Sequence, residues 1–385
     1  MGFLNGRVTF ARFRVSGDSP LPFSEEHLDT ARAHLIGVHG EADPTDGISV
    51  GWAGGDHVLD TTLDIGKNIV NDALHLAMRV DTDKIPGTLL KAYTKIETDA
   101  RARMNPSGYA NKAQKQEAKE AAKARAESEA KDGRFRRMAH YPILWDGMSN
   151  IVYAGVTSLS VLDRVQTLFR ETFDRILEPI SAGSLAHSLA GVRGHESTVE
   201  SHVPLGYLGA DGHSSVAWSD ASDVTRPDYW GNEFLIWLWH TLQADGDTIR
   251  LPDDSEVTVM LSKTLVLDCP RGETGRDQLA HEGPTKLPEA FRALQAGKLP
   301  RKAGLILVRH GSQYELTLQA ETLAVSGAAM PKIEGASGHD LHLARVDALR
   351  HLVETLDLLY DAYGRCRTGP DWNGEMGRIR TWLAA

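Results

Sequence analysis

The sequence predicts an α+β fold built from mixed antiparallel sheets and long helices. Several short segments alternate apolar and polar residues, as strands do, while others repeat apolar residues at helical spacing. The two patterns do not follow the regular β-α-β order that a parallel sheet requires. The chain has 385 residues, enough for roughly two domains.

The first half opens with a predicted strand over residues 6–15, which are rich in β-branched and aromatic side chains. Ser24 precedes two glutamates and predicts a helix that runs to about Ile36. A loop is expected over 37–55, and extended segments over 56–65 and 73–81. Pro86 suits the first turn of a helix that ends near Met104.

A hairpin is expected next, because two apolar segments flank the turn sequence at 146–150. An amphipathic helix follows, with an apolar stripe from Val161 to Leu177. Residues 181–232 show little periodicity, and 232–243 predict a short helix with Trp237 and Trp239. Three domains or segments are therefore expected: 1–180, an insertion or linker with a Trp-rich element at 181–263, and 264–385.

The second half continues with strands over 248–252, 256–261 and 263–269 and a helix over 287–297. A second hairpin is predicted from 304–310 and 314–319. The last long helix is expected from about Leu341 to Arg365, followed by a tail in which Trp372 and Trp382 dock onto the body.

Composition excludes several classes of protein. The net charge is −10, and the two cysteines, Cys269 and Cys366, form no Cys-x-x-Cys pair, so neither a disulfide framework nor a zinc ribbon is expected. The N-terminus lacks the pattern of a secretory signal, and no apolar run is long enough to span a membrane. We expect a cytosolic protein without a cofactor and without a membrane partner.

Charge is distributed unevenly along the chain. Residues 91–137 hold thirteen Lys and Arg and seven Asp and Glu, a net of +6, so the remainder carries −16. Within this segment Lys112, Lys115, Lys119 and Lys123 follow helical spacing and predict a row of cations on one helix face. Such a row suits a nucleic-acid backbone, and the alanines between them would let a phosphate approach closely.

Two other interpretations of the basic segment stay open. Glu and Lys at helical spacing also make a solvated helix, held by pairs worth roughly 0.2–0.5 kcal/mol each. A partner protein could equally contact such a face. From Asn111 onward no aromatic residue occurs before Phe135, so stacking on single-stranded bases is not predicted.

Three further patterns could carry chemistry. Arg309-His310-Gly311 at the end of a predicted strand resembles the start of histidine phosphatases, although a hairpin turn explains it as well. His339 with His342, and His195 with Glu196 and His202, have spacings that could hold a metal but lack a further ligand. Asp56, Asp60 and Asp64 would share one face of a strand and could hold Mg²⁺ for a nuclease.

The order of elements and several short motifs resemble the recombination-associated protein RdgC family of bacteria. The similarity rests on the opening strand, Val50-Gly51-Trp52, the helix after Ile85-Pro86, the Lys/Glu-rich segment, Ile143-Leu144-Trp145-Asp146, and the segment 290–298. It covers about residues 3–180 and 264–365. Residues 181–263 and the tail after Arg365 depart from the family pattern.

The resemblance implies a non-enzymatic, ring-shaped homodimer that encircles double-stranded DNA without sequence preference and restrains RecA-dependent recombination on the nucleoid. A metal-dependent exonuclease and a scaffold that does not bind DNA are the alternatives. Phe135 lies near a family position that makes a dimer contact. The basic segment 88–137 supplies the expected DNA-binding residues, which are Lys91, Lys95, Arg101, Arg103, Lys112, Lys115, Lys119, Lys123, Arg125, Arg134, Arg136 and Arg137.

Overall fold

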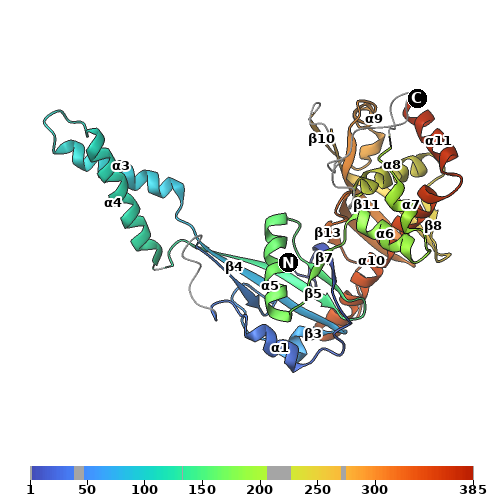
Figure 1. Cartoon of the computed structure of the whole chain (residues 1–385), viewed down its shortest axis with the longest axis horizontal. Helices are drawn as coiled ribbons and strands as arrows, with labels where there is room; N and C mark the ends of the chain where they lie inside the picture. The colour runs from blue at the N-terminus through green and yellow to red at the C-terminus, as the bar shows by residue number, and fades with distance from the viewer. Residues whose placement is uncertain (1, 39–46, 132, 206–226, 270–274, 385) are drawn as a thin grey trace. The chain divides into compact units, whose positions relative to one another are not determined.

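The computed structural model describes residues 2–38, 47–131, 133–205, 227–269 and 275–384. It has the expected α+β composition, with antiparallel strand pairs and long helices (Figure 1). The chain forms two compact units. Unit 1 contains residues 1–24, 66–75 and 142–385, and unit 2 contains 25–65 and 76–141, so the units follow different boundaries from the three expected segments.

Unit 1 is built on a continuous series of antiparallel strands in the order β10-β9-β11-β12-β13-β1-β6-β5, with β7 beside β1 and β8 beside β9. Strand β5 passes from unit 2 into this unit. The strands are β1 (Val8–Val15), β3 (Ile69–Val70), β5 (Arg136–Asp146), β6 (Ile151–Ala154), β7 (Leu177–Pro179), β8 (Thr248–Arg250), β9 (Glu256–Asp268), β10 (Arg276–His281), β11 (Leu299–Arg309), β12 (Ser312–Gln319) and β13 (Val325–Ala329).

Both expected hairpins of unit 1 are confirmed. In the first, Ile143 pairs with Ala154 and Asp146 with Ile151; in the second, β11 and β12 pair from Lys302 to Arg309. The segments 256–261 and 263–269, expected as two strands, form the single strand β9. A continuous strand is possible because β11 pairs with β9 along its length, with register shifts that absorb the irregularity near Lys263.

The helices of unit 1 are α2 (Ile65–Asn68, at the boundary), α5 (Leu159–Phe173), α6 (Ala182–Gly191), α7 (Glu196–Ser201), α8 (Tyr229–Ala244), α9 (Pro288–Gln295), α10 (Gly338–Thr368) and α11 (Trp372–Ala384), with a short 3-10 turn at Pro284–Lys286. Helix α5 ends before the expected Leu177, because Asp174 takes a left-handed conformation and Leu177 joins β7. Ile176, expected on the apolar stripe, is exposed.

Residues 181–263 take part in the core of unit 1, as far as they are described. Helix α8 is buried from Tyr229 to His240, and at Gly231 it lies so close to the carbonyl of Ala320 that no side chain would fit. Helices α6 and α7 lie where little periodicity was visible in the sequence. The part of this segment at 206–226 lies outside the described residues.

The tail docks onto unit 1, as expected. Trp372 is buried, and its ring centroid lies 4.9 Å from the guanidinium carbon of Arg367. The Trp382 ring meets Phe291 edge to face at 5.2 Å and Trp239 at 5.7 Å. Aromatic pairs of this geometry stabilise a contact beyond the area that they bury, so α11 is an integral part of the unit.

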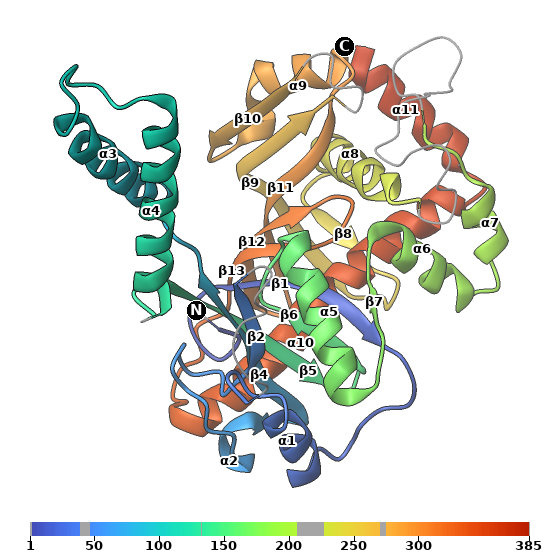
Figure 2. The ribbon, with the colours of Figure 1, turned by 60° about the vertical axis from the view of Figure 1, so that its left-hand side comes forward.

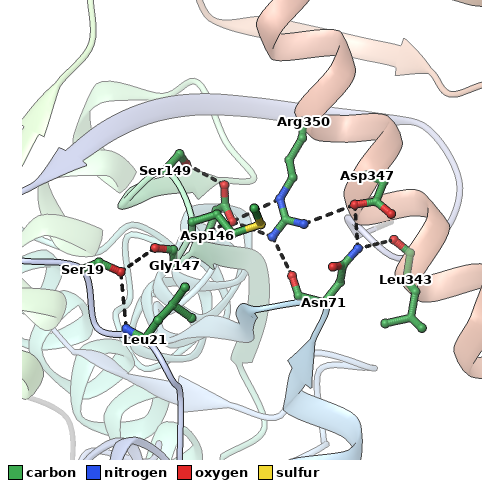
Figure 3. A network of polar contacts seen from close by, with 10 residues as sticks. Ser19, Leu21, Asn71, Asp146, Gly147, Ser149, Leu343, Asp347 and Arg350 are labelled. Atoms are coloured by element: carbon green, nitrogen blue, oxygen red, sulfur yellow. Dashed lines mark hydrogen bonds and ion pairs between the residues drawn. The ribbon is translucent and has the colours of Figure 1, made fainter.

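Helix α10 is tied to several strands and turns by ion pairs. Figure 3 shows one such network, in which Arg350 donates to the buried carboxylate of Asp146 at 2.7 Å and to the carbonyl of Asn71 at 2.6 Å. Asn71 in turn donates to Asp347 at 2.7 Å. Because these groups belong to α10, to the turn that follows β3 and to the end of β5, the network fixes three segments that are distant in sequence.

Unit 2 contains α1 (Glu25–Arg32), β2 (Ile48–Ala53), most of β4 (Ala73–Asp83), α3 (Gly87–Arg103) and α4 (Lys112–Lys131). Strands β2 and β4 pair antiparallel from Ile48–Thr82 to Ala53–Ala77. Helix α1 stops before the expected Ile36, because His34 and Ile36 bond to the main chain of Trp52. No strand forms over 56–65, which was expected to be extended. None of the helices in the described part of the chain is long and apolar enough to cross a membrane.

Glu233 and Arg367 generate a testable prediction for unit 1. Both side chains are buried, and the guanidinium lies 3.0 Å from the carboxylate. Burial raises the pKa of Glu233 above its ordinary value, and Arg367 opposes that rise. Replacing Arg367→Leu leaves a buried charge without its partner, and we expect a loss of about 3–5 kcal/mol in the free energy of unfolding at neutral pH.

The variant should also show a characteristic pH dependence. Loss of Arg367 raises the folded-state pKa of Glu233 further above its unfolded-state value. The free energy of unfolding of the variant is therefore greatest below the unfolded-state pKa and falls as pH rises through the folded-state pKa. Urea unfolding at about pH 5 and about pH 8 measures this difference. Arg365→Leu is the matched control, because Arg365 is half exposed and Asp361 keeps Arg193. Equal losses in the two variants would contradict the prediction.

Candidate nucleic-acid interface

Helices α3 and α4 form an antiparallel helical hairpin in unit 2, which we call the arm (residues 87–131). Figure 2 shows the two helices side by side and joined at one end. Ala118, Ala122 and Ala126 are fully buried and lie one turn apart on α4. They form the contact with α3, so their small size brings the two helices together. The expectation that these alanines admit a phosphate is therefore wrong for these three positions.

Tyr93 sets the register of the arm. Its hydroxyl donates to Glu129 at 2.7 Å, and the Arg125 guanidinium lies over its ring at 4.2 Å from the centroid. The hydrogen bond raises the pKa of Tyr93 and lowers the pKa of Glu129. Further along α3, Arg101 lies 2.8 Å from Glu97 and 3.8 Å from Glu117. Polar contacts thus flank the alanine stripe.

The expected DNA-binding cations divide into two groups. Five have carboxylate partners: Arg101 as above, Lys123 with Glu127 at 3.4 Å, Arg125 and Arg134 with Glu129, and Arg136 with Asp83 at 2.9 Å. Bonding to Asp83 raises the pKa of Arg136. These five side chains form ion pairs within unit 2, so neighbouring carboxylates largely neutralise their charge.

The second group has no ion-pair partner among the residues that the structure describes. It consists of Lys91, Lys95, Arg103, Lys112, Lys115, Lys119 and Arg137, all of them exposed. Lys112, Lys115 and Lys119 lie on one flank of α4, at the spacing predicted from the sequence, and we call them the lysine ridge. Lys123, predicted to continue the row, is exposed but paired with Glu127.

Two residues of the lysine ridge, Lys112 and Lys115, lie where a helix normally carries acidic residues. Lys112 is the first residue of α4 and Lys115 follows one turn later, and the first turn contains no Asp or Glu. The amino end of a helix is electropositive, so a cation there costs roughly 0.3–1 kcal/mol. No carboxylate of the described chain offsets this placement. A departure from the preference for acidic residues at a helix N-terminus, with no compensating contact, is typical of a functional surface.

Phe135 lies in the turn between α4 and β5, half-buried, with Arg134 before it and Arg136 after it. This turn is at the opposite end of α4 from the α3–α4 loop. The loop instead exposes Met104, at 84%, and Tyr109, at 80%. Neither residue belongs to the basic pattern that predicted the interface, although large apolar residues inside a loop that breaks a helix could have indicated them.

The acidic residues Asp56, Asp60 and Asp64 do not share a strand face, because residues 56–64 form a loop. Asp60 is buried, and its carboxylate accepts the main-chain N–H groups of Asp56 and Thr62 at 3.2 and 3.1 Å. It therefore shapes the loop. In the ranges that the structure describes, no group of three or more His, Cys, Asp or Glu could hold a metal ion, the candidate histidines included.

Arg309 ends β11, where it pairs with Ser312 of β12, and His310 and Gly311 form the turn between them, which confirms the hairpin interpretation of this motif. His310 is exposed and has a positive φ of 49°. Arg309 is buried and bonds to Asp253 at 2.5 Å and Glu354 at 2.8 Å. Because the protein itself supplies both carboxylates that neutralise this guanidinium, its role is to join β11 to α10 and the β8–β9 turn.

The alanine contact predicts how the arm responds to a larger side chain. Replacing Ala122→Leu inserts a bulky group where α4 meets α3, which should weaken the contact by about 1–3 kcal/mol. We expect faster amide hydrogen exchange throughout α3 and α4. Ala124→Leu is the matched control, because Ala124 is exposed and leucine is a good helix former. Unchanged exchange in Ala122→Leu would show that the alanines do not hold the arm together.

Comparison with known proteins does not assign the chain to a family. No protein-family model matches the sequence, and no curated protein matches it.

Proposed function

We propose that the protein binds double-stranded DNA through its phosphate backbone, without reading base sequence, by means of the arm. The observation that carries the proposal is the lysine ridge: three exposed lysines on one flank of α4, without carboxylate partners in the described chain, two of them (Lys112 and Lys115) at the electropositive end of the helix. Phosphates would supply the missing counter-charge. An acidic protein with one basic segment would also direct DNA to that segment and repel it elsewhere.

The dimensions suit this role. Seven residues separate Lys112 from Lys119, which is about 10 Å along a helix axis. Duplex DNA carries about six phosphate charges over that distance. Lysines bind phosphates as flexible point charges, and contacts of this kind position a protein on DNA but carry no sequence information. Arg103 and the exposed lysines of α3 extend the positive surface along the arm.

The resemblance to the RdgC family extends the proposal. We infer from it a homodimer that closes a ring around DNA, with Phe135 as a dimer contact, and that restrains RecA-dependent recombination on the nucleoid of the cytoplasm. Support for this part is the similarity of element order and motifs alone. The alternatives, a metal-dependent exonuclease and a scaffold that contacts another protein, give different results in the binding experiment below.

Fluorescence anisotropy tests the proposal directly. A labelled duplex of about 30 base pairs is titrated with the protein over a series of salt concentrations, because each phosphate that the protein neutralises adds about 0.9 to the slope of log affinity against log salt. Binding that weakens steeply with salt supports the proposal. A parallel sample with Mg²⁺ should leave the DNA intact. Cleavage would favour the nuclease, and absence of binding at low salt would favour the scaffold.

Charge reversal of the lysine ridge gives a specific prediction. The triple variant Lys112→Glu, Lys115→Glu and Lys119→Glu should lower affinity on the order of a hundredfold and reduce the salt slope by about 3, one for each lysine. Acidic residues at the start of α4 also suit the helix dipole, so the arm should stay folded by circular dichroism.

The matched control removes the same charge from unit 1. Lys286, Lys302 and Lys332 are all exposed, and their replacement by glutamate changes the net charge equally. This control should keep most of the affinity and the full salt slope. Equal losses in both triple variants would mean that net charge alone governs binding, and that the arm is not the interface.

A further inference from the structure

The outer end of the arm exposes apolar side chains that the fold does not use. Met104 is 84% and Tyr109 is 80% exposed, whereas Ala110 is the one buried residue of the 104–111 loop. Both large side chains belong to a short loop between two helices, and small polar residues would be sufficient to form such a loop. Isolated exposed apolar residues are common on proteins. Two large ones in a single, otherwise polar loop indicate a surface that contacts a partner.

Polar side chains hold this loop in one conformation. Asn111 and Gln114 form a capping box: the Gln114 N–H donates to Asn111 Oδ1 at 2.9 Å, and the Asn111 N–H donates to Gln114 Oε1 at 3.0 Å. Asn105 Nδ2 donates to the Tyr109 carbonyl at 2.6 Å, and Gln114 Nε2 donates to Asn105 Oδ1 at 3.1 Å. Tyr109 is thus presented from an ordered loop, which reduces the entropic cost of its binding.

The chain on both sides of the loop is basic. Between Ala100 and Gln116 the chain has four cations, Arg101, Arg103, Lys112 and Lys115, and no carboxylate. Arg101 is paired with Glu97 and also lies 3.8 Å from Glu117, and the other three cations have no ion-pair partner in the described chain. A second copy of the same loop would meet this surface with like charge. A polyanion is the partner whose charge is complementary.

Size decides how DNA could meet the arm. Two packed helices have axes about 8–10 Å apart, and each is about 10–12 Å wide, so the pair is about 20 Å across. The major groove is about 12 Å wide and the minor groove about 6 Å. One helix of the arm alone is about as wide as the major groove, whereas neither helix fits the minor groove. The minor groove therefore admits only side chains of the loop at the end of the arm, while a flank of the arm can follow the backbone.

We propose that the arm inserts Tyr109, supported by Met104, into the minor groove as a wedge against a base step, and so kinks the duplex. This inference rests on the proposed DNA binding and adds a structural consequence to it. Apolar side chains inserted between base steps are a general means of bending DNA. Arg103 and Lys112 would hold the phosphates on either side of the loop.

The wedge is tested with the full-length chain and a duplex that carries the fluorescent base 2-aminopurine at its centre and a donor–acceptor pair at its ends. Wild-type protein should raise the 2-aminopurine fluorescence, because the base is unstacked, and should shorten the end-to-end distance. The double variant Met104→Ala and Tyr109→Ala should lose both signals. Its affinity should fall less than about tenfold, and its salt slope should stay unchanged, because phosphate contacts supply most of the binding.

Two controls make the result specific. Tyr109→Phe keeps the ring and should keep both signals. Val192→Ala removes another highly exposed apolar side chain, at 88%, and should behave as wild type. Circular dichroism should show the same helix content in the double variant as in wild type, because both replaced side chains are exposed, and the unchanged salt slope reports an intact lysine ridge.

Other outcomes overturn the inference. If wild type binds DNA without any change in fluorescence or distance, or if the double variant keeps both changes, there is no wedge, while the proposed function stands. If wild type fails to bind the duplex, the proposed function fails and the wedge with it. Tyr109-dependent binding to vesicles of anionic phospholipid, with DNA bending unaffected by Tyr109→Ala, would assign the loop to a membrane surface.

Discussion

The ion pairs along α10 are the interaction on which unit 1 depends. This helix presents Arg350 to Asp146, Glu354 to Arg309 and Asp357 to Arg12, at 2.7, 2.8 and 2.7 Å. Further along, it presents Arg367 to Glu233. The partners belong to β5, β11, β1 and α8. Because breaking a buried pair leaves an uncompensated charge, α10 holds these segments in one arrangement, and the apolar core packs around it.

Unit 2 shows the opposite use of charge. In the arm, the apolar contact is little more than three alanines, and the cations that are not needed for its register stay exposed and unpaired within the described residues. A thin helical pair of this kind gains little from burial. Its value is in the surface that it presents. Lys112 and Lys115 oppose the helix dipole at the start of α4, and the loop before it exposes Tyr109, so local stability is lower than the same length of helix could achieve.

The two proposals concern different parts of the arm, so DNA binding and DNA kinking can be tested independently. The flank of α4 would supply affinity, which salt weakens, and the loop would supply deformation of the duplex, which salt affects only through binding. Contacts with phosphates and an apolar wedge against a base step involve no hydrogen bonds to base edges, so both proposals are compatible with binding that does not read base sequence directly. Both roles require the alanine contact, since it keeps the two helices together and the loop in place.

The sequence by itself determined the elements that local periodicity encodes: both hairpins, α4 with its row of lysines, the long α10, and the docking tryptophans of the tail. Only the tertiary structure decided which groups meet. It placed Ala118, Ala122 and Ala126 against α3 and paired Lys123 with Glu127. It also placed Asp60 in a loop and left Tyr109 exposed at the end of the arm. The physical reason is that periodicity reports which face of an element is apolar, whereas ion pairs and exposure depend on partners many residues away, such as Glu129 for Tyr93.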